Sequence, residues 1–344
     1  LQTIATARRR SGSARLWYGG ARIGDVGGRL VKLRRLTARF PEQRWRYNLV
    51  YLLSNAPYLT PGALQLLKRR RVPIVLNQNG VFYPAWFAGD WRAMNARMAH
   101  AYHAAGHVFW QSAFCRDAAE RFLGPRKGPG EILFNAVDTR LFAPEAGARA
   151  PGPFRFLMTG KLDRHMLYRP QAAIEGLAVA RGQGLDARLI LAGHFDPEVA
   201  RMIATRSAAL GLAAQIEMRG PYTQAQAPKI YAAADAYLAL TFNDCCPNAV
   251  IEAMACGLPV LFNASGGTPE LVGPAAGVKL KVEAGWERVQ VPTPDAIAAG
   301  MLRIASGCDA MAAAARSRAV ETLDIHSWLA RHEAVFGALL GDSS

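Results

Sequence analysis

The feature that most constrains the fold is a regular alternation of short apolar runs with helix-like segments. Such runs, when turn residues bound them, are typical of strands, and a helix between two strands is typical of a parallel crossover. In the first half the strand-like runs are Ala14–Tyr18, Tyr47–Ser54, Val72–Asn77, His107–Gln111 and Gly130–Asn135. Between them lie the helix-like segments Gly28–Phe40, Pro61–Arg70, Trp91–Ala105 and Phe114–Leu123. The pattern predicts parallel α/β layers that bind ligands at the carboxyl ends of the strands.

The alternation stops at Pro144–Pro153 and then begins again. This stretch has three prolines, two glycines and no apolar periodicity, which predicts a linker. A chain of 344 residues also suits two domains, since one domain usually takes about 100–200 residues. We therefore predict a first domain over residues 1–143, a linker over 144–153, a second domain over 154–324 and a terminal helix over 325–344.

The second half has the same architecture with a different sequence. Its strand-like runs are Phe154–Thr159, Ala187–Ala192, Ile216–Arg219, Ala236–Leu240 and Pro259–Phe262. Its helix-like segments are Pro170–Gln183, Pro197–Leu210, Gln226–Ala233, Asn248–Cys256 and Ile325–Leu340. No apolar run of about 18 residues occurs, so no membrane-spanning helix is expected.

The positive charge is concentrated in the first 71 residues. They carry 16 lysines and arginines against two acidic residues, a balance of +14, whereas the other 273 residues carry 25 against 24. A basic block of this kind attracts phosphate-rich partners, above all an anionic membrane surface, or it keeps the protein soluble. Nucleic acid is not expected as a partner, because the block lacks a known reader module and interleaved stacking aromatics.

The five cysteines and the start of the chain point to a cytoplasmic protein. The cysteines form no CxxC pair and are odd in number, which indicates reduced thiols, and the adjacent Cys245 and Cys246 would form a strained disulfide. Residues 1–10 lack the apolar core and small-residue site of a secretion signal. With the basic block, this predicts a cytoplasmic enzyme that binds the inner membrane surface peripherally.

The most specific stretch is Asn243–Gly273, which reads NDCCPNAVIEAMACGLPVLFNASGGTPELVG. Its two acids, Asp244 and Glu252, flank a loop that enters a helix. Free backbone N–H groups at the start of that helix would bind an anion, and the helix dipole favours negative charge there. The expected anion site is formed by Asn248, Ala249 and Val250. With a diphosphate at this site, Glu252 could accept bonds from two ribose hydroxyls and Asp244 could reach a transferred sugar. The alternative is that both acids only stabilise the helix start.

This stretch resembles the donor-binding region of family 4 glycosyltransferases, through the acid-x7-Glu spacing followed by AMACGLPV and GGTPELVG. Asn135–Pro144 (NAVDTRLFAP), Phe156–Leu162 (FLMTGKL) and Leu189–Gly193 (LILAG) resemble further segments of that family in the same order. The resemblance implies the GT-B fold, which has two Rossmann-like domains facing a central cleft and a C-terminal helix crossing back to the first domain. The family usually has Glu where this chain has Asp244, and Gly where it has Ala136.

The resemblance also implies fixed cations beside the donor diphosphate. Gly160 and Lys161 stand where the family usually has Gly-Arg, and Lys161 would act as a point charge. Either Arg164 or Arg169 would supply the second cation. Such cations stabilise the charge that develops on a leaving diphosphate without a metal ion.

In the first domain, Gly27 and Gly28 precede the basic helix where the family has a glycine-rich loop near the donor phosphates. The pair Gly19-Gly20 is a rival for that position. After the third strand the family often has a His, whereas this chain has amides, Asn77–Asn79, of which Asn79 is the catalytic candidate on the acceptor side. An amide is no base at neutral pH, which suits a retaining mechanism in which a donor phosphate oxygen takes the acceptor proton.

Metal binding has little support in the sequence. His100, His103 and His107 could share a helical face, yet no Cys or carboxylate nearby completes a zinc site. No Asp-x-Asp pair occurs to hold a divalent ion under a diphosphate, so no metal and no other cofactor is expected. A Ser-His-Asp hydrolase and a dinucleotide oxidoreductase lack their motifs.

The sequence therefore predicts a retaining, metal-independent hexosyltransferase. Its donor would be a nucleotide-diphosphate sugar, and its acceptor a saccharide or a lipid-linked acceptor in cell-surface polysaccharide or glycolipid synthesis. Two alternatives remain open: a nucleotide-sugar epimerase or hydrolase on the same fold, and a binding protein without catalysis.

Overall fold

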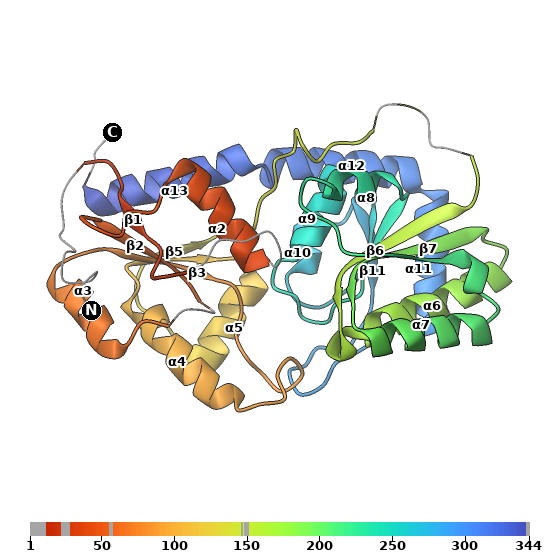
Figure 1. The fold of residues 1–344 in the computed structure, drawn as a ribbon, viewed down its shortest axis with the longest axis horizontal. Coiled ribbons are helices and arrows are strands. Elements are labelled where there is room, and N and C mark those ends of the chain that lie inside the picture. The colour runs from red at the N-terminus through yellow and green to blue at the C-terminus, as the bar shows by residue number, and fades with distance from the viewer. Residues whose placement is uncertain (1–11, 22–27, 55–57, 146, 148–150, 342–344) are drawn as a thin grey trace. The chain divides into compact units, whose positions relative to one another are not determined.

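The computed structural model in Figure 1 describes residues 12–21, 28–54, 58–145, 147 and 151–341. The chain forms two compact units, each described by itself below. The first unit comprises Leu1–Asn135, Trp286–Arg288 and Ile325–Ser344, and the second comprises Ala136–Gly285 and Val289–Asp324. The segment 144–153, expected as a linker, therefore belongs to the second unit.

The first unit is built on a parallel five-stranded sheet in the order β1-β2-β3-β4-β5. These strands span Leu16–Trp17, Leu49–Leu53, Ile74–Gln78, His107–Trp110 and Gly130–Ile132. Its helices are α2 (Gly28–Arg39), α3 (Pro61–Arg69), α4 (Trp91–Ala104), α5 (Ala113–Leu123) and α13 (Ile325–Leu340). Helices α2 and α13 lie on one side of the sheet in Figure 1, and α3, α4 and α5 lie on the other.

Helix α13 packs back on the first unit, which confirms that expectation of the sequence. His332 on α13 is fully buried, and its ring lies 4.5 Å from that of Phe109 on β4. Its Nε2 is 3.0 Å from the Tyr51 hydroxyl, and its Nδ1 is 2.8 Å from the Trp328 carbonyl oxygen. Burial lowers the pKa of His332 to about 3, so a neutral imidazole joins α13 to the sheet at physiological pH.

The second unit is built on a parallel six-stranded sheet in the order β11-β10-β9-β6-β7-β8. In chain order the strands are β6 (Phe154–Leu162), β7 (Ala187–Phe195), β8 (Ile216–Arg219), β9 (Ala236–Ala239), β10 (Val260–Asn263) and β11 (Gly277–Leu280). Between β6 and β9 the strand order reverses. Open α/β sheets bind ligands at such a reversal, outside the carboxyl ends of the strands.

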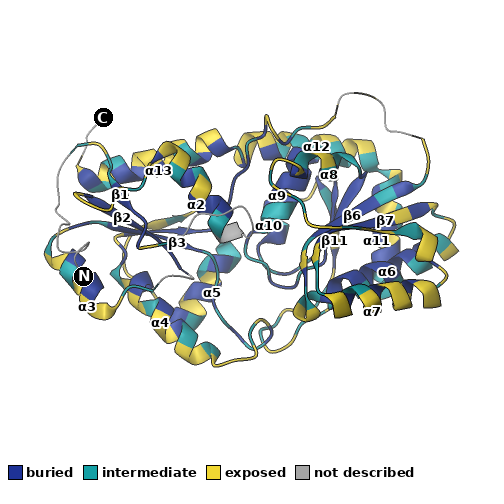
Figure 2. Cartoon of the chain, in the orientation of Figure 1, coloured by how far each residue is buried: buried dark blue, intermediate teal, exposed yellow. Residues whose placement is uncertain are grey.

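Helices cover both faces of this sheet. They are α6 (Tyr168–Gly182), α7 (Pro197–Ala209), α8 (Ala227–Ala232), α9 (Asn248–Ala255), α10 (Thr268–Val272), α11 (Pro294–Ser306) and α12 (Cys308–Thr322). Buried side chains of α6, α7 and α11 pack on Phe154, Phe156 and Met158 of β6 to form the main core. In both units the inner strands are buried, the edge strands β5 and β8 are largely exposed, and the helices expose their outer faces (Figure 2).

Three features of the second unit differ from the expectation. Strands β6 and β7 continue for three residues beyond Thr159 and Ala192, because Gly160 pairs with Gly193 and both adopt a positive φ. A Cβ on Gly193 would lie 2.0 Å from the Gly160 carbonyl oxygen, so only glycine fits. Gly160 and Lys161, which the predicted strand Phe154–Thr159 leaves out, therefore lie within β6. The elements β11, α10, α11 and α12 are also absent from the predicted set.

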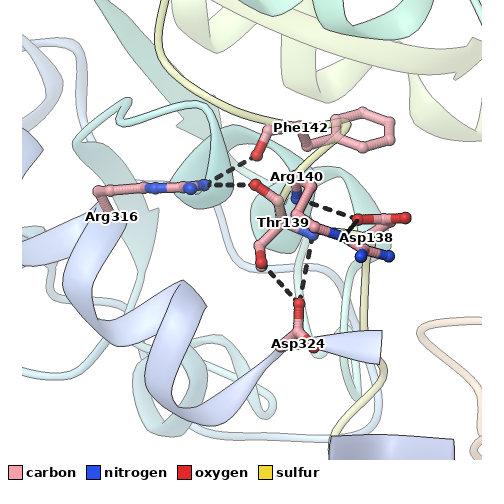
Figure 3. A network of polar contacts seen from close by, with 6 residues as sticks. All are labelled: Asp138, Thr139, Arg140, Phe142, Arg316 and Asp324. Carbon is pink, nitrogen blue, oxygen red and sulfur yellow. Dashed lines mark hydrogen bonds and ion pairs between the residues drawn. The ribbon is translucent and has the colours of Figure 1, made fainter. Parts of the chain in front are cut away.

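A polar network joins the start and the end of the second unit (Figure 3). Asp324 accepts hydrogen bonds from the Thr139 hydroxyl at 2.6 Å and, more weakly, from the Thr139 N–H at 3.4 Å. Nη1 of Arg316 donates to the carbonyl oxygens of Thr139 and Phe142 at 2.9 Å and of Ala255 at 2.7 Å. The last of these bonds caps the carboxyl end of α9, where a cation also complements the helix dipole.

Candidate functional site

A cavity of about 150 Å³ lies at the reversal of strand order in the second unit. Its walls come from the carboxyl end of β6, from β9 and the loop after it, and from the starts of α6, α9 and α10. The lining residues are Thr159, Arg169, Tyr237, Ala239, Thr241, Asp244, Pro247, Asn248, Ala249, Val250 and Thr268. Five of the residues singled out in the sequence thus line one cavity: Arg169, Asp244, Asn248, Ala249 and Val250.

Backbone contacts fix the position of Asp244. The preceding residue, Asn243, has a positive φ of 55° and donates its N–H to the Ser265 hydroxyl at 3.0 Å. The Asp244 carbonyl accepts from Gly267 N–H at 2.8 Å, and a Cβ on Gly266 would lie 2.3 Å from that same oxygen. The loop after β9 therefore packs directly on the glycine pair before α10, which explains why glycine is needed at position 266.

Burial raises the pKa of the Asp244 carboxyl. Two contacts oppose this rise: the N–H of Cys246, which donates to Oδ1 at 3.1 Å, and the positive charge of Arg169. The cavity thus contains one acid and one base of opposite charge. A charged ligand entering it would meet both groups in partly buried surroundings, where electrostatic interactions are stronger than in bulk water.

Arg169 is a buried cation at the start of α6. It is 7% exposed, and its Nη2 donates to the Thr159 carbonyl oxygen at 3.2 Å at the end of β6. Its Nε is buried and has no hydrogen-bond partner among the described residues. Guanidinium groups with unused N–H donors are well suited to bind phosphate oxygens.

Helix α9 begins at Asn248, as the sequence predicts, and its first turn faces the cavity. The backbone N–H groups of Asn248 and Ala249 make no hydrogen bond within the described residues. The expected free N–H at Val250 is wrong, because it donates to the Pro247 carbonyl oxygen at 3.1 Å. This bond tightens the first turn and leaves two outward N–H groups for an anion rather than three.

Glu252 lies one turn inside α9 and is only 5% exposed. Its Oε2 accepts a hydrogen bond from the hydroxyl of Tyr231 on α8 at 2.9 Å. Glu252 is not among the residues that line the cavity. Tyr231 had no signal in the sequence, because its contact with Glu252 arises from packing between α8 and α9.

The other expected cations lie outside this cavity. Lys161 is on the extended part of β6, with its side chain 65% exposed and its Nζ 3.2 Å from Asp163. Arg164 is in the short 3-10 helix after β6, with its side chain 82% exposed and 3.9 Å from Glu198. Gly160 lies beside Arg169, since a Cβ on it would be 3.7 Å from Nη1.

In the first unit, Asn79 belongs to a buried polar cluster at the carboxyl ends of β3 and β4. Nζ of Lys32 on α2 donates to Oδ1 of Asn77 at 2.6 Å and to Oδ1 of Asn79 at 2.9 Å. Nε2 of Gln111 donates to both of these oxygens as well. The sequence reading missed Lys32 and Gln111, which only the fold brings to Asn79.

The two glycine pairs can be compared only in part. Gly27 lies outside the described residues, and Gly28 is the first residue of α2. The rival pair, Gly19 and Gly20, lies one residue after the end of β1, with positive φ values of 66° and 84°. This is a tight turn that requires glycine.

Two of the three histidines considered for metal binding have other partners. His103 Nε2 is 2.7 Å from the Leu123 carbonyl oxygen, and His107 Nε2 is 3.2 Å from Glu131. Within the part of the chain that the structure describes, no three His, Cys, Asp or Glu side chains gather as a metal site. The five cysteines are free thiols.

Helix α2 carries part of the basic block and buries its apolar face. Val31, Leu33, Leu36 and Phe40 are all less than 9% exposed, so this face packs within the first unit.

Among the described helices, none alone is long and apolar enough to cross a membrane. On length and composition only, α11 and α12 would pass as a broken pair, bent by 87°.

Comparisons with known proteins agree with this arrangement. Residues 153–313, which include the whole cavity, match the family described as glycosyl transferases group 1. The solved structure of Alr3699/HepE of Anabaena in complex with UDP superposes with a TM-score of 0.68 at 18% identity, over 85% of this chain and 79% of that one. The chain has the GT-B fold.

Two further GT-B structures support the same conclusion. Sucrose-phosphate synthase of Thermosynechococcus elongatus gives a TM-score of 0.65 at 19% identity, over 90% of this chain and 77% of that one. The pneumococcal O-GlcNAc transferase GtfA, in complex with UDP and GlcNAc, gives 0.63 at 14% identity, over 91% and 60%. No curated protein matches the sequence. The family match and the GT-B fold together support a glycosyltransferase.

Proposed function

We propose that the protein is a retaining hexosyltransferase of glycosyltransferase family 4, which takes its sugar from a nucleotide-diphosphate sugar. The observation that carries this proposal is the cavity at the strand reversal of the second unit. It combines a buried guanidinium, the start of a helix and a carboxylate, which suit a diphosphate and a sugar hydroxyl.

The donor diphosphate is proposed to bind Arg169 and the N–H groups of Asn248 and Ala249. As the glycosidic bond breaks, negative charge grows on the leaving diphosphate, and fixed positive groups lower the energy of that state without a metal ion. Lys161 is proposed as an additional cation, since its flexible side chain is largely exposed beside β6. Glu252 is proposed to bind the ribose, and Asp244 the transferred sugar.

The acceptor is proposed to bind on the side of Asn79 in the first unit. Asn79 can orient an acceptor hydroxyl but cannot remove its proton. A phosphate oxygen of the donor takes this proton in the proposed mechanism, so the new bond forms on the same face of the sugar and the anomeric configuration is retained.

The acceptor is proposed to be a saccharide or a lipid-linked molecule in the synthesis of cell-surface polysaccharide or glycolipid. The basic block favours a lipid-linked acceptor, because an enzyme held at an anionic membrane meets such acceptors at high local concentration. UDP is the first nucleotide to test, since Alr3699/HepE and GtfA were each solved with UDP.

The proposed function is tested by a transfer assay with product analysis. A thermal-shift screen of nucleotide sugars selects the donor, since a ligand at about 100 times its dissociation constant stabilises by about 2.7 kcal/mol. The selected donor is then incubated with saccharide and lipid-linked acceptor pools, with and without EDTA. We expect a glycosylated acceptor of retained configuration and a free nucleoside diphosphate in both conditions.

Other products would contradict the proposal in distinct ways. An altered nucleotide sugar formed without acceptor would identify an epimerase, and free sugar formed without acceptor a hydrolase. Tight donor binding with no turnover on any pool would identify a binding protein. Loss of activity in EDTA that manganese or magnesium restores would contradict metal independence.

A further inference from the structure

The carboxylate of Glu252 lies in the interior of the second unit. A buried carboxylate is unfavourable unless polar groups pair with it. The hydroxyl of Tyr231 supplies such a pair, with a distance of 2.9 Å to Oε2. A hydrogen bond to an ionised group is among the stronger ones in proteins and also fixes the direction of the carboxylate.

Packing holds the Tyr231 ring in one place. Tyr231 is fully buried, and its ring centroid lies 6.0 Å from that of Tyr237 on β9 and 6.1 Å from that of Phe142. Burial raises the pKa of Tyr231 well above its ordinary value of 10, and the charge of Glu252 raises it further. The hydroxyl therefore keeps its proton at physiological pH and is a permanent donor to Glu252.

The other titratable groups around this pair keep their charge state near neutral pH. Burial raises the pKa of Tyr222 to about 12 and that of Cys256, on the same helix as Glu252, to about 12. Burial also raises the pKa of Tyr237. The positive charge of Arg316 on α12 opposes the rise in the pKa of Cys256.

We propose that Tyr231 is a positioning residue of the donor site, whose hydroxyl holds the Glu252 carboxylate in one orientation for the donor ribose. This inference rests on the proposed function. Tyr231 is expected to act through Glu252, because it is fully buried and its hydroxyl donates to that carboxylate. Loss of the Tyr231 hydroxyl alone leaves the packing of the ring intact and removes one hydrogen-bond donor to Glu252.

The test compares nucleotide binding by wild type and by Tyr231→Phe. The dissociation constant for UDP, or for the nucleoside diphosphate that the thermal-shift screen selects, is measured by calorimetry from about pH 5.5 to about pH 8.5. We expect binding about tenfold weaker at neutral pH, because one hydrogen bond to a charged group is lost. The pH profile of binding is compared as well, because loss of a hydrogen bond to the charged form of a carboxylate favours its neutral form.

Two further variants make the test specific. Tyr18→Phe also removes a buried tyrosine hydroxyl, which donates to the Phe40 carbonyl oxygen at 2.7 Å in the first unit, and should leave nucleotide binding unchanged. When Glu252→Gln is already present, Tyr231→Phe should change the dissociation constant by less than a third of the change it causes in wild type. The reason is that the two residues act as one unit.

The outcomes separate this inference from the proposed function. Equal affinity and an equal pH profile in wild type and Tyr231→Phe would overturn the inference while the function stands. A full effect of Tyr231→Phe in the Glu252→Gln background would also overturn it, since the role would then be structural. If wild type binds no nucleoside diphosphate, the proposed function fails and the inference fails with it.

Discussion

Arg169 is the residue on which the chemistry of the cavity depends most. The sequence left Arg164 and Arg169 as equal candidates for the second cation, because both follow the same strand within a few residues. The fold separates them: Arg169 is 7% exposed and lines the cavity, whereas the Arg164 side chain is 82% exposed. Burial of one arginine and exposure of its neighbour depend on the packing of α6, which no local pattern reveals.

Replacement of Arg169 tests this assignment. Arg169→Gln should weaken binding of a nucleoside diphosphate by about 1.5–3 kcal/mol, since a bond from a charged donor to phosphate is lost. Calorimetry measures the change, and circular dichroism confirms that the variant is folded. Arg206→Gln is the control, because Arg206 is an exposed cation on α7 that pairs with Glu175 at 2.7 Å. A larger loss of affinity in Arg164→Gln than in Arg169→Gln would show that the assignment is wrong.

The two acids illustrate what residue spacing can and cannot reveal. The spacing of Asp244 and Glu252 places both at the entry of α9, and the helix begins at Asn248 as expected. Their surroundings depend on tertiary contacts: Asp244 faces Arg169, and Glu252 faces Tyr231. The same limit explains why Lys32 and Gln111 were missed beside Asn79.

The sequence located the terminal helix of the chain, but it missed helices both with and without clear end signals. The predicted terminal helix, Ile325–Leu340, has the bounds of α13, and the predicted strand start at His107 is that of β4. Helix α12 is rich in alanine and has no apolar stripe, which explains why it was missed. Helix α11 was detectable, because Thr293 caps it and Pro294 is its first residue.

The helices that carry the basic block have exposed cations available for a membrane surface. Arg34 on α2 and Lys68, Arg69 and Arg71 at the end of α3 are exposed. Because the apolar face of α2 is buried, we expect attraction to be electrostatic, without insertion by this face. Each cation near an anionic surface contributes about 1 kcal/mol, and salt screens this attraction within roughly 8 Å at physiological ionic strength.

Co-sedimentation with liposomes tests this prediction. The protein should sediment with vesicles that contain anionic lipid at low salt, remain in solution at high salt, and ignore neutral vesicles. Glutamine at Lys68, Arg69 and Arg71 together should reduce sedimentation, and glutamine at the exposed Arg201 and Arg206 of the second unit should not. Binding that is independent of salt and lipid charge would leave the basic block as a solubility or donor-steering feature.

At the scale of the whole molecule, the sequence predicted two α/β domains with parallel sheets and a terminal helix that packs on the first domain. The structure confirms both predictions. The order of the strands in each sheet could not be predicted from the sequence. Which strands pair depends on how the crossover helices pack on the two faces of the sheet. That order matters for function, since the reversal between β6 and β9 defines where the cavity lies.

Hydrogen–deuterium exchange with and without the donor tests the central claim, that a nucleotide-diphosphate sugar binds at this reversal in the second unit. The account predicts slower exchange in peptides covering 159–169 and 243–252 when UDP-sugar, or the donor selected by the screen, is added. Peptides that cover the edge strand β8 of the same sheet, such as 213–219, serve as the internal reference and should not change. Protection that appears only in the first unit, or no protection at a saturating donor concentration, would contradict the account.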